Sequence, residues 1–271
     1  MASVRSDVLI EEKAAVDESK AFDKAAAKGR EGGLYRACMS QIRGSHSVGQ
    51  SLRLGLVATG LLSDVNCYTE ALVQFYVCTK ALDKRLRSSS SSVVAKVHSA
   101  VDKYSFVAGY EADLRQLLGE QRWTAEVEAR TSVAAATYCQ RLAGASDLDL
   151  VAAVFVLHGA LIIGGGAAME PRVKARFKAV ELFKNVIGPG RADRRTDFMT
   201  LFDQLIDESN QPDFKAIVSG TGEFMEQNNA LMLGMHKKPY WYYPAVVAFV
   251  GIAAGITLAA IRYVAPQVFK S

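Results

Sequence analysis

Three consecutive glycines, Gly164, Gly165 and Gly166, follow an almost wholly apolar stretch at residues 148–163. Because glycine has no Cβ atom, such a segment lets the backbone lie directly against a flat ligand. The alternative is structural, since glycines at the end of a buried helix stop the helix and allow close backbone packing. The sequence alone leaves both interpretations open.

His158 lies inside the same apolar stretch. An imidazole can bind a metal ion, but a single histidine on an apolar helix is more typical of a buried residue with a hydrogen-bond partner. The chain shows no nucleotide-binding glycine loop, zinc motif or nucleophile elbow in its required context. No cysteines form a C-x-x-C pair, and we expect reduced, buried thiols. The cysteines are Cys38, Cys67, Cys78 and Cys139.

The elements that position these residues are predicted to be helices. Apolar residues recur at steps of three and four through most of residues 34–235, and no segment alternates like a strand before a hairpin turn. Asp147 is a plausible N-cap for residues 148–163, which should lie in the middle of a bundle because they are apolar on all sides. We expect an all-α domain of about seven or eight helices. They include residues 93–118, 131–142, 148–163, 173–186, 196–208 and 213–233.

The composition is that of an ordinary globular protein, with 22% charged and 50% apolar residues among 271. The net charge of +4 is weak and dispersed, so no nucleic-acid partner is expected. Residues 1–33 mix acids and bases without an apolar core, which argues against a secretory signal. We expect these residues to form a polar N-terminal arm.

The region around the apolar helix resembles the heme oxygenases. In that family a distal helix ends in a glycine-rich kink over the heme, and residues 161–166, Leu-Ile-Ile-Gly-Gly-Gly, match its Gly-Asp-Leu-Ser-Gly-Gly signature. The resemblance covers about residues 34–235 and implies a heme-oxygenase-like multi-helical bundle. Further matching segments, in the same order along the chain, are residues 60–63 with Tyr68 and Leu72, residues 111–114, residues 119–123, and residues 141–152.

The resemblance also implies positions for heme contacts. His46, followed by Gly49 and Gln50, stands where the family has its proximal histidine, and a neutral imidazole is a sound iron ligand. Arg43, one turn earlier, is the retained basic candidate for a heme propionate. Alternatively, His46 is a polar or helix-terminal residue, because Gly-Ser-His-Ser is a poor helix interior. If heme binds, Gly164 to Gly166 would lie against it.

Other positions depart from the family. Ile162 replaces the distal aspartate, which in active heme oxygenases orders the water network that delivers protons to iron-bound oxygen. Thr79 stands at the tyrosine that feeds this network. Met199 and Asp203 stand where basic residues should hold the propionates, and an aspartate would repel them. The chemistry is therefore largely missing, and no cofactor is expected unless the protein is a divergent heme oxygenase.

The C-terminal segment, residues 236–271, predicts a membrane anchor. An uncharged apolar run from Ala245 to Ile261, extended to Tyr242, is about 20 residues or roughly 30 Å of helix, the thickness of a bilayer's hydrocarbon core. Aromatic residues at 240–243 are typical of a membrane interface. Gly251 and Gly255 form a G-x-x-x-G motif that lets two helices approach closely. We expect a single transmembrane helix at about 242–261.

Two functions remain open. The first is a non-catalytic accessory subunit of a membrane complex, which contacts lipid and binds other membrane subunits through the tail helix and the bundle surface. A mitochondrial membrane is favoured, with the endoplasmic reticulum as the alternative. The second is a divergent tail-anchored heme oxygenase that cleaves heme to biliverdin, iron and CO with a reductase partner and His46 as ligand. The missing groups favour the first.

Overall fold

The computed structural model describes residues 30–58, 61–62, 64–206 and 209–237. Within these residues there are ten α-helices, a π-helical turn and a 3-10 turn, and no strand, which confirms the all-α prediction and exceeds the predicted helix count. The elements are α2 (Leu34–Ala58), α3 (Val65–Ser88), α4 (Ser92–Asp102), α5 (Phe106–Leu118), α6 (Trp123–Arg130), α7 (Val133–Ala143), α8 (Asp147–Gly159), η1 (Ala160–Gly164), α9 (Gly165–Arg176), η2 (Glu181–Phe183), α10 (Arg191–Asp203) and α11 (Gln211–Leu233).

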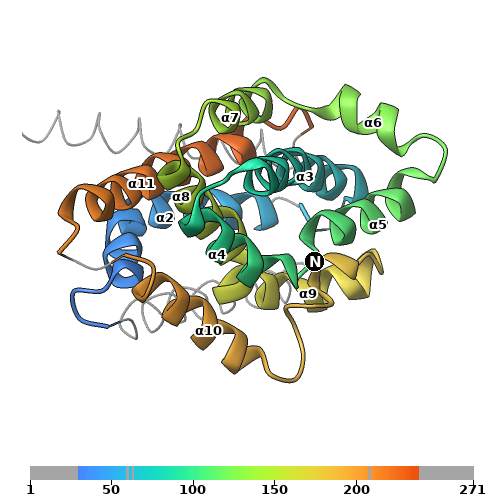
Figure 1. Ribbon diagram of the computed structural model, residues 1–271. Coiled ribbons are helices and arrows are strands. Elements are labelled where there is room, and N and C mark those ends of the chain that lie inside the picture. Colours follow the sequence, from blue (N-terminus) through green and yellow to red (C-terminus); the bar gives the residue numbers. More distant parts are fainter. Residues whose placement is uncertain (1–29, 59–60, 63, 207–208, 238–271) are drawn as a thin grey trace, which may run out of the picture.

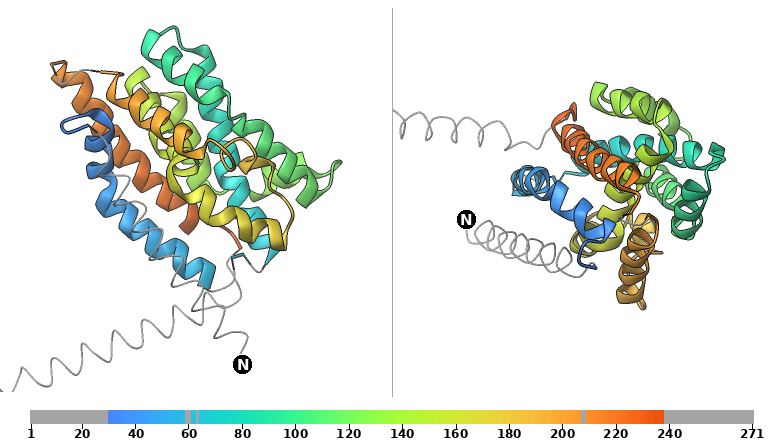
Figure 2. Two further views of the ribbon diagram at one scale, coloured as in Figure 1. Left: turned by 90° about the horizontal axis from the view of Figure 1, so that it is seen from below. Right: turned by 60° about the vertical axis from the view of Figure 1, so that its left-hand side comes forward.

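Helix α8 lies in the middle of the bundle (Figure 1). Its residues from Leu150 to Gly159 are all buried, as predicted for a helix that is apolar on every side. Helix α11 packs against both α2 and α8, and α4 also packs against α8. Helix α3 packs against α5 and α7, and Figure 2 shows α2 and α11 running side by side.

The start of α8 is fixed by a reciprocal pair of side chains. Ser146, not Asp147, is the N-cap, so the predicted cap was wrong by one residue. The Ser146 hydroxyl accepts the Asp149 N–H at 3.1 Å, and the Asp149 carboxylate accepts the Ser146 N–H at 3.2 Å. This capping box satisfies two donors that the first helical turn would leave unpaired, and it explains why the apolar helix tolerates an acid.

The glycine triplet does not stop the helix. The chain passes from α8 through the π-helical turn η1 directly into α9, which begins at Gly165. The other part of the structural interpretation, close backbone packing, is confirmed at Gly166. A Cβ atom there would meet the carbonyl oxygen of Leu161 at 2.8 Å. Glycine at position 166 therefore allows the backbone to approach the Leu161 carbonyl oxygen across the π-helical turn.

Three predicted helices were wrong in extent, and one of them, predicted at residues 196–208, is α10 at Arg191–Asp203. Residues 93–118 divide into α4 and α5 at Ser105, which has a left-handed φ of 51°. Apolar periodicity continues across this break because both helices bury a face against α3. Residues 173–186 are not one helix, since α9 ends at Arg176 and η2 follows. The buried Asp113 carboxylate holds η2 by accepting the N–H groups of Glu181 at 2.9 Å and Leu182 at 3.1 Å.

Across the described part of the chain, no helix is both long enough and apolar enough to cross a bilayer. The predicted transmembrane helix at 242–261, with Gly251 and Gly255, lies outside the described residues. So does most of the predicted polar arm, of which the structure describes residues 30–33. The anchor, the arm and the domain bounds at 34–235 all stay predictions.

Candidate functional site

Helix α2 carries both residues that the resemblance assigns to heme contacts. It runs without a break from Leu34 to Ala58, so His46 lies inside a helix and not at its end. His46 is half-buried and Arg43 is exposed. The helix is held in place at this point by α11, against which it packs along its length. The structure thus supplies a helical support for His46, while its role as an iron ligand stays a prediction.

The contact between α2 and α11 is close beside His46. The Asn229 side-chain amide donates to the Ser45 carbonyl oxygen at 2.7 Å, and a Cβ atom on Gly49 would overlap the Asn229 side chain. The small residue three positions after His46 is therefore needed for helix packing. Asn229 and its neighbour Asn228 are both buried. The Asn229 amide group therefore binds the backbone of α2.

Ile162 lies in η1, at the position where the resemblance expects the distal aspartate. Its side chain is 1% exposed and belongs to the main apolar core. An aliphatic side chain donates and accepts no hydrogen bonds, so it cannot order water molecules. Between Leu150 and Met169 the sequence contains no aspartate or glutamate that could take its place. The glycine-rich segment thus has no carboxylate at the position where the resemblance expects one.

Asp203, at the end of α10, binds the start of α2. Its carboxylate accepts the N–H of Tyr35 at 3.0 Å and the N–H of Arg30 at 3.0 Å. A Cβ atom on Gly33 would overlap the same carboxylate. An acid at a helix N-terminus is favourable because it faces unpaired N–H donors and the positive end of the helix dipole. Asp203 therefore has a structural partner in place of a propionate.

The middle of α10 is also used for packing. The Phe198 ring packs against α8, where a Cβ atom on Gly159 would meet it at 3.3 Å. The same ring lies 4.9 Å from Phe202 and 6.1 Å from Phe155, measured between centroids. Met199 is half-buried against the same core. The segment of α10 where the resemblance expects basic residues therefore packs against α8 through Phe198 and binds the start of α2 through Asp203.

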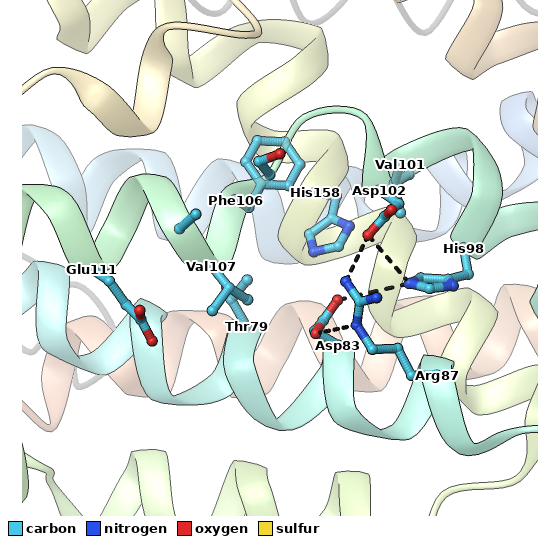
Figure 3. A pocket seen from close by; sticks show the side chains of 12 residues that line it. Thr79, Asp83, Arg87, His98, Val101, Asp102, Phe106, Val107, Glu111 and His158 are labelled. Atoms are coloured by element: carbon cyan, nitrogen blue, oxygen red, sulfur yellow. Dashed lines mark hydrogen bonds and ion pairs between the residues drawn. The ribbon is translucent and has the colours of Figure 1, made fainter.

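Thr79 lies in α3 and is 3% exposed. Burial raises the pKa of Tyr110 of α5, and interaction with the Thr79 side chain partly offsets this rise. Thr79 also lines a cavity of about 370 Å³ between α3, α4, α5 and α8 (Figure 3). Most of the charged and titratable groups at this cavity come from α3 and α4, α5 supplies most of the remaining lining, and the central helix α8 contributes His158. The charged and histidine side chains among its lining are Asp83, Arg87, His98, Asp102, Glu111 and His158.

His158 enters this cavity from α8. It is 4% exposed, as expected for a histidine on an apolar helix, but neither ring nitrogen has a hydrogen-bond partner among the described residues. The Phe106 ring lies 4.8 Å away, between centroids. Burial lowers the pKa of His158 to about 4, with Asp83 raising and His98 lowering it to smaller extents. The imidazole is therefore neutral at physiological pH.

Two pairs of residues from consecutive helices meet at the cavity. Asp83 and Arg87 are one turn apart on α3, and their ion pair has an Nε to Oδ2 distance of 2.9 Å. His98 and Asp102 are one turn apart on α4. This group was not predicted from the sequence, although the two residues of each pair are four positions apart. Residues four apart share one face of a helix. If the two helices had been expected to fold back on one another at the serines of residues 88–92, the two pairs would have been expected to meet.

Comparison with known proteins gives a result for structure only. A scan against protein-family models and a search of curated proteins found no match. Among solved structures, heme oxygenase 2 from Chlamydomonas reinhardtii, without heme, has a TM-score of 0.68 at 23% identity, covering 77% of this chain and 99% of its own.

Two bacterial structures agree. Heme oxygenase-1 from the cyanobacterium Synechocystis, in complex with heme, has a TM-score of 0.63 at 17% identity, covering 83% of this chain and 99% of its own. The heme oxygenase from Leptospira interrogans has a TM-score of 0.61 at 16% identity, covering 74% and 98%. The resemblance found in the sequence is therefore confirmed at the level of architecture, and the chain has a heme-oxygenase-like fold.

Proposed function

We propose that this protein is a heme-oxygenase-like protein that does not cleave heme, and that it serves as an accessory subunit of a membrane complex. The observation that carries the first part is Ile162, a buried aliphatic side chain where the reaction needs an acid to order water. Asp203 adds support, because its carboxylate is taken up by the start of α2. Without an acid at position 162 the protein has no group there to deliver protons, and without basic residues on α10 it has no partner there for the heme propionates.

The second part of the proposal follows from the tail. A helix that served only as an anchor needs no small residues, whereas Gly251 and Gly255 provide a face on which another membrane helix can pack closely. The partners are other membrane subunits, which bind the tail helix and the bundle surface. A mitochondrial membrane is the favoured location, with the endoplasmic reticulum as the alternative. No cofactor is required for this role.

The alternative is a divergent heme oxygenase that uses His46 as proximal ligand and a reductase as electron donor. What favours it is the intact helix α2, which carries His46 with Arg43 one turn earlier. Gly164 to Gly166 would then lie against the heme. This activity would still need a proton relay to replace the missing aspartate.

Hemin titration of the full-length protein in mild detergent separates the two functions. The proposal expects no sharp Soret band and no biliverdin when a reductase is supplied. A Soret band that His46→Ala removes, together with biliverdin formation, would establish the alternative. His236→Ala is the matched control, because His236 is half exposed and lies beside Glu70. Its change should leave any specific heme spectrum intact.

The accessory role is tested by extracting the tagged protein from its own membrane and measuring the size of the assembly. Replacing Gly251 and Gly255 by leucine should release the protein from a large complex while leaving it membrane-bound. Ile256→Leu, outside the motif, is the control and should keep the complex. A wild-type protein that migrates alone after gentle extraction would contradict the accessory role, whatever the hemin result.

A further inference from the structure

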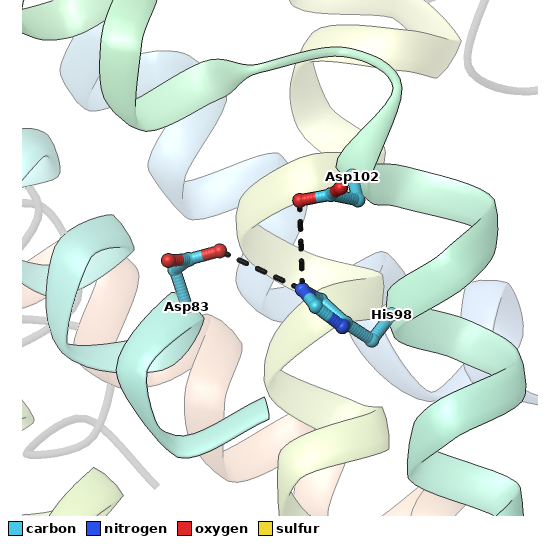
Figure 4. Close-up of side chains that lie close together, drawn as sticks. All are labelled: Asp83, His98 and Asp102. Carbon is cyan, nitrogen blue, oxygen red and sulfur yellow. Dashed lines mark ion pairs between the residues drawn. The ribbon is translucent and has the colours of Figure 1, made fainter. Parts of the chain in front are cut away.

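The cavity between α3, α4, α5 and α8 holds a group of side chains that the proposed function does not use. One nitrogen or oxygen atom from each of Asp83, His98 and Asp102 lies within 4.8 Å of the others (Figure 4). His98 Nε2 lies 3.8 Å from Asp83 Oδ1 and 3.6 Å from Asp102 Oδ1. These three atoms surround a space that a small ion could occupy with short adjustments of side-chain torsions.

A second observation comes from a different helix. His158 of α8 is more than nine-tenths buried, and both its ring nitrogens lack hydrogen-bond partners among the described residues. Its ring is directed into the same cavity (Figure 3). His98 Nε2 is likewise buried without a hydrogen bond. Buried polar atoms are nearly always satisfied in folded proteins, so this concentration of unsatisfied nitrogens points to a missing ligand.

A cation already occupies part of the site. The Arg87 guanidinium binds Asp83 through Nε at 2.9 Å and Asp102 through Nη2 at 2.7 Å. Two carboxylates facing one another would repel without such a positive charge. The Arg87 side chain is 56% exposed, so it can move into solvent and leave two negative charges beside His98. Arg87 therefore acts as a counter-ion that another cation could replace.

We propose that this cavity is a binding site for one divalent transition-metal ion, with His98 Nε2 and one oxygen each of Asp83 and Asp102 as ligands. Imidazole nitrogen combined with carboxylate oxygen suits ions of the zinc and cobalt class, whereas magnesium and calcium prefer oxygen alone. His158 lies outside the group of three and contacts a water molecule bound to the ion. The site is independent of whether the protein binds heme.

The test is titration of the full-length protein, in mild detergent and without a histidine tag, with Co²⁺. Wild type should show visible d–d absorption that saturates at one ion per chain and is displaced by Zn²⁺. His98→Ala should weaken Co²⁺ binding by more than the roughly 10-fold to 100-fold that loss of a ligand's hydrogen-bonding partner costs. Arg87→Gln should tighten it about 10-fold, because the competing positive charge is removed.

His236→Ala is the control, since His236 also lies near a carboxylate, that of Glu70, but does not line the cavity. The affinity of the His236→Ala variant for Co²⁺ should equal that of wild type. Asp102 is half exposed, so Asp102→Asn provides a ligand variant that folds even if a change in the core does not. Circular dichroism shows which variants are folded.

Two outcomes would overturn the site. The first is the absence of stoichiometric Co²⁺ binding in both wild type and Arg87→Gln. The second is Co²⁺ binding that folded His98→Ala and Asp102→Asn both retain, which would place the ion elsewhere. Binding that both ligand variants weaken and Arg87→Gln strengthens supports the proposal.

Discussion

The region that resembles the heme oxygenases in sequence and the cavity between α3, α4, α5 and α8 differ in what their helices carry. The first has the features on which the resemblance rests, a glycine-rich segment after a central helix and a histidine on α2, and has Ile162 and Asp203 where the resemblance expects an acid and a basic residue. Apart from Glu111 and Thr79, the second is lined by residues outside the motifs that carry the resemblance, and it gathers acids, an arginine and two histidines. Close backbone packing thus characterises the first region, and titratable side chains characterise the second.

The physical reason lies in how each region is stabilised. Gly49, Gly159 and Gly166 each lie so close to a neighbour that a Cβ atom would crowd it, so the packing itself depends on them. Ile162, in contrast, only has to fill space in an apolar core. Packing alone therefore accounts for these glycines, and such a pattern is weak support for heme binding.

The largest expected effect tests whether α10 now serves packing. Asp203→Ala should lower the free energy of unfolding by about 2–3 kcal/mol, because two backbone donors at the start of α2 lose a charged acceptor. Urea denaturation of the full-length protein in detergent measures it. Asp197→Ala on the same helix is the control, since Asp197 is 63% exposed and lies 3.7 Å from Lys103. It should change stability by less than about 0.5 kcal/mol. Equal losses in both variants would remove the structural role of Asp203.

The cavity region should show itself through pH. The folded protein keeps His158 neutral down to a pKa of about 4, whereas in the unfolded chain it takes up a proton near 6.5. Stability is therefore lost as pH falls from the unfolded pKa towards the folded one, by about 2 kcal/mol between pH 7.5 and 5. His158→Gln should lose less over this interval, measured by urea denaturation at each pH. Parallel curves for the two proteins would mean that His158 does not resist protonation.

How far the sequence predicts these two regions depends on the signal each one gives. Periodicity located α8 and α11, because a helix that is buried on one or all sides shows its pattern locally. It failed at residues 93–118 and 173–186, where apolar residues on two elements happen to continue one period. The left-handed residues Ser105 and Lys178, which mark these breaks, are not glycines and gave no sequence signal.

The candidate functional residues also differ in how far the sequence predicts them. The glycine-rich segment and His46 could be proposed from the sequence because they are contiguous in the chain or match a family motif, and their roles stay predictions. Asp83 and His98 come from two helices, and nothing in either helix alone indicates that they approach His158 of α8. The structural role of Asp203 was not predicted either. Its bond to Tyr35 spans 168 residues and could not be predicted from either segment.

A smaller effect is expected in the glycine-rich segment. Gly166→Ala should lower the free energy of unfolding by about 1–2 kcal/mol, because the new Cβ atom would meet the Leu161 carbonyl oxygen at 2.8 Å and the backbone has to shift. Thermal denaturation followed by circular dichroism measures the change. A neutral result would mean that η1 relaxes easily, and that the glycine is not explained by packing.

The smallest effect should have the opposite sign and sharpens the contrast within the heme-oxygenase-like region. Gly44 lies inside α2, two residues before His46, and a Cβ atom there would meet nothing within 4 Å. Alanine loses less backbone freedom than glycine when a helix forms, so Gly44→Ala should raise the free energy of unfolding by about 0.5–1 kcal/mol. Thermal denaturation against Gly166→Ala in the same buffer gives the comparison. A loss of stability at Gly44 would show that another part of the chain covers this face of α2, which would close the approach to His46.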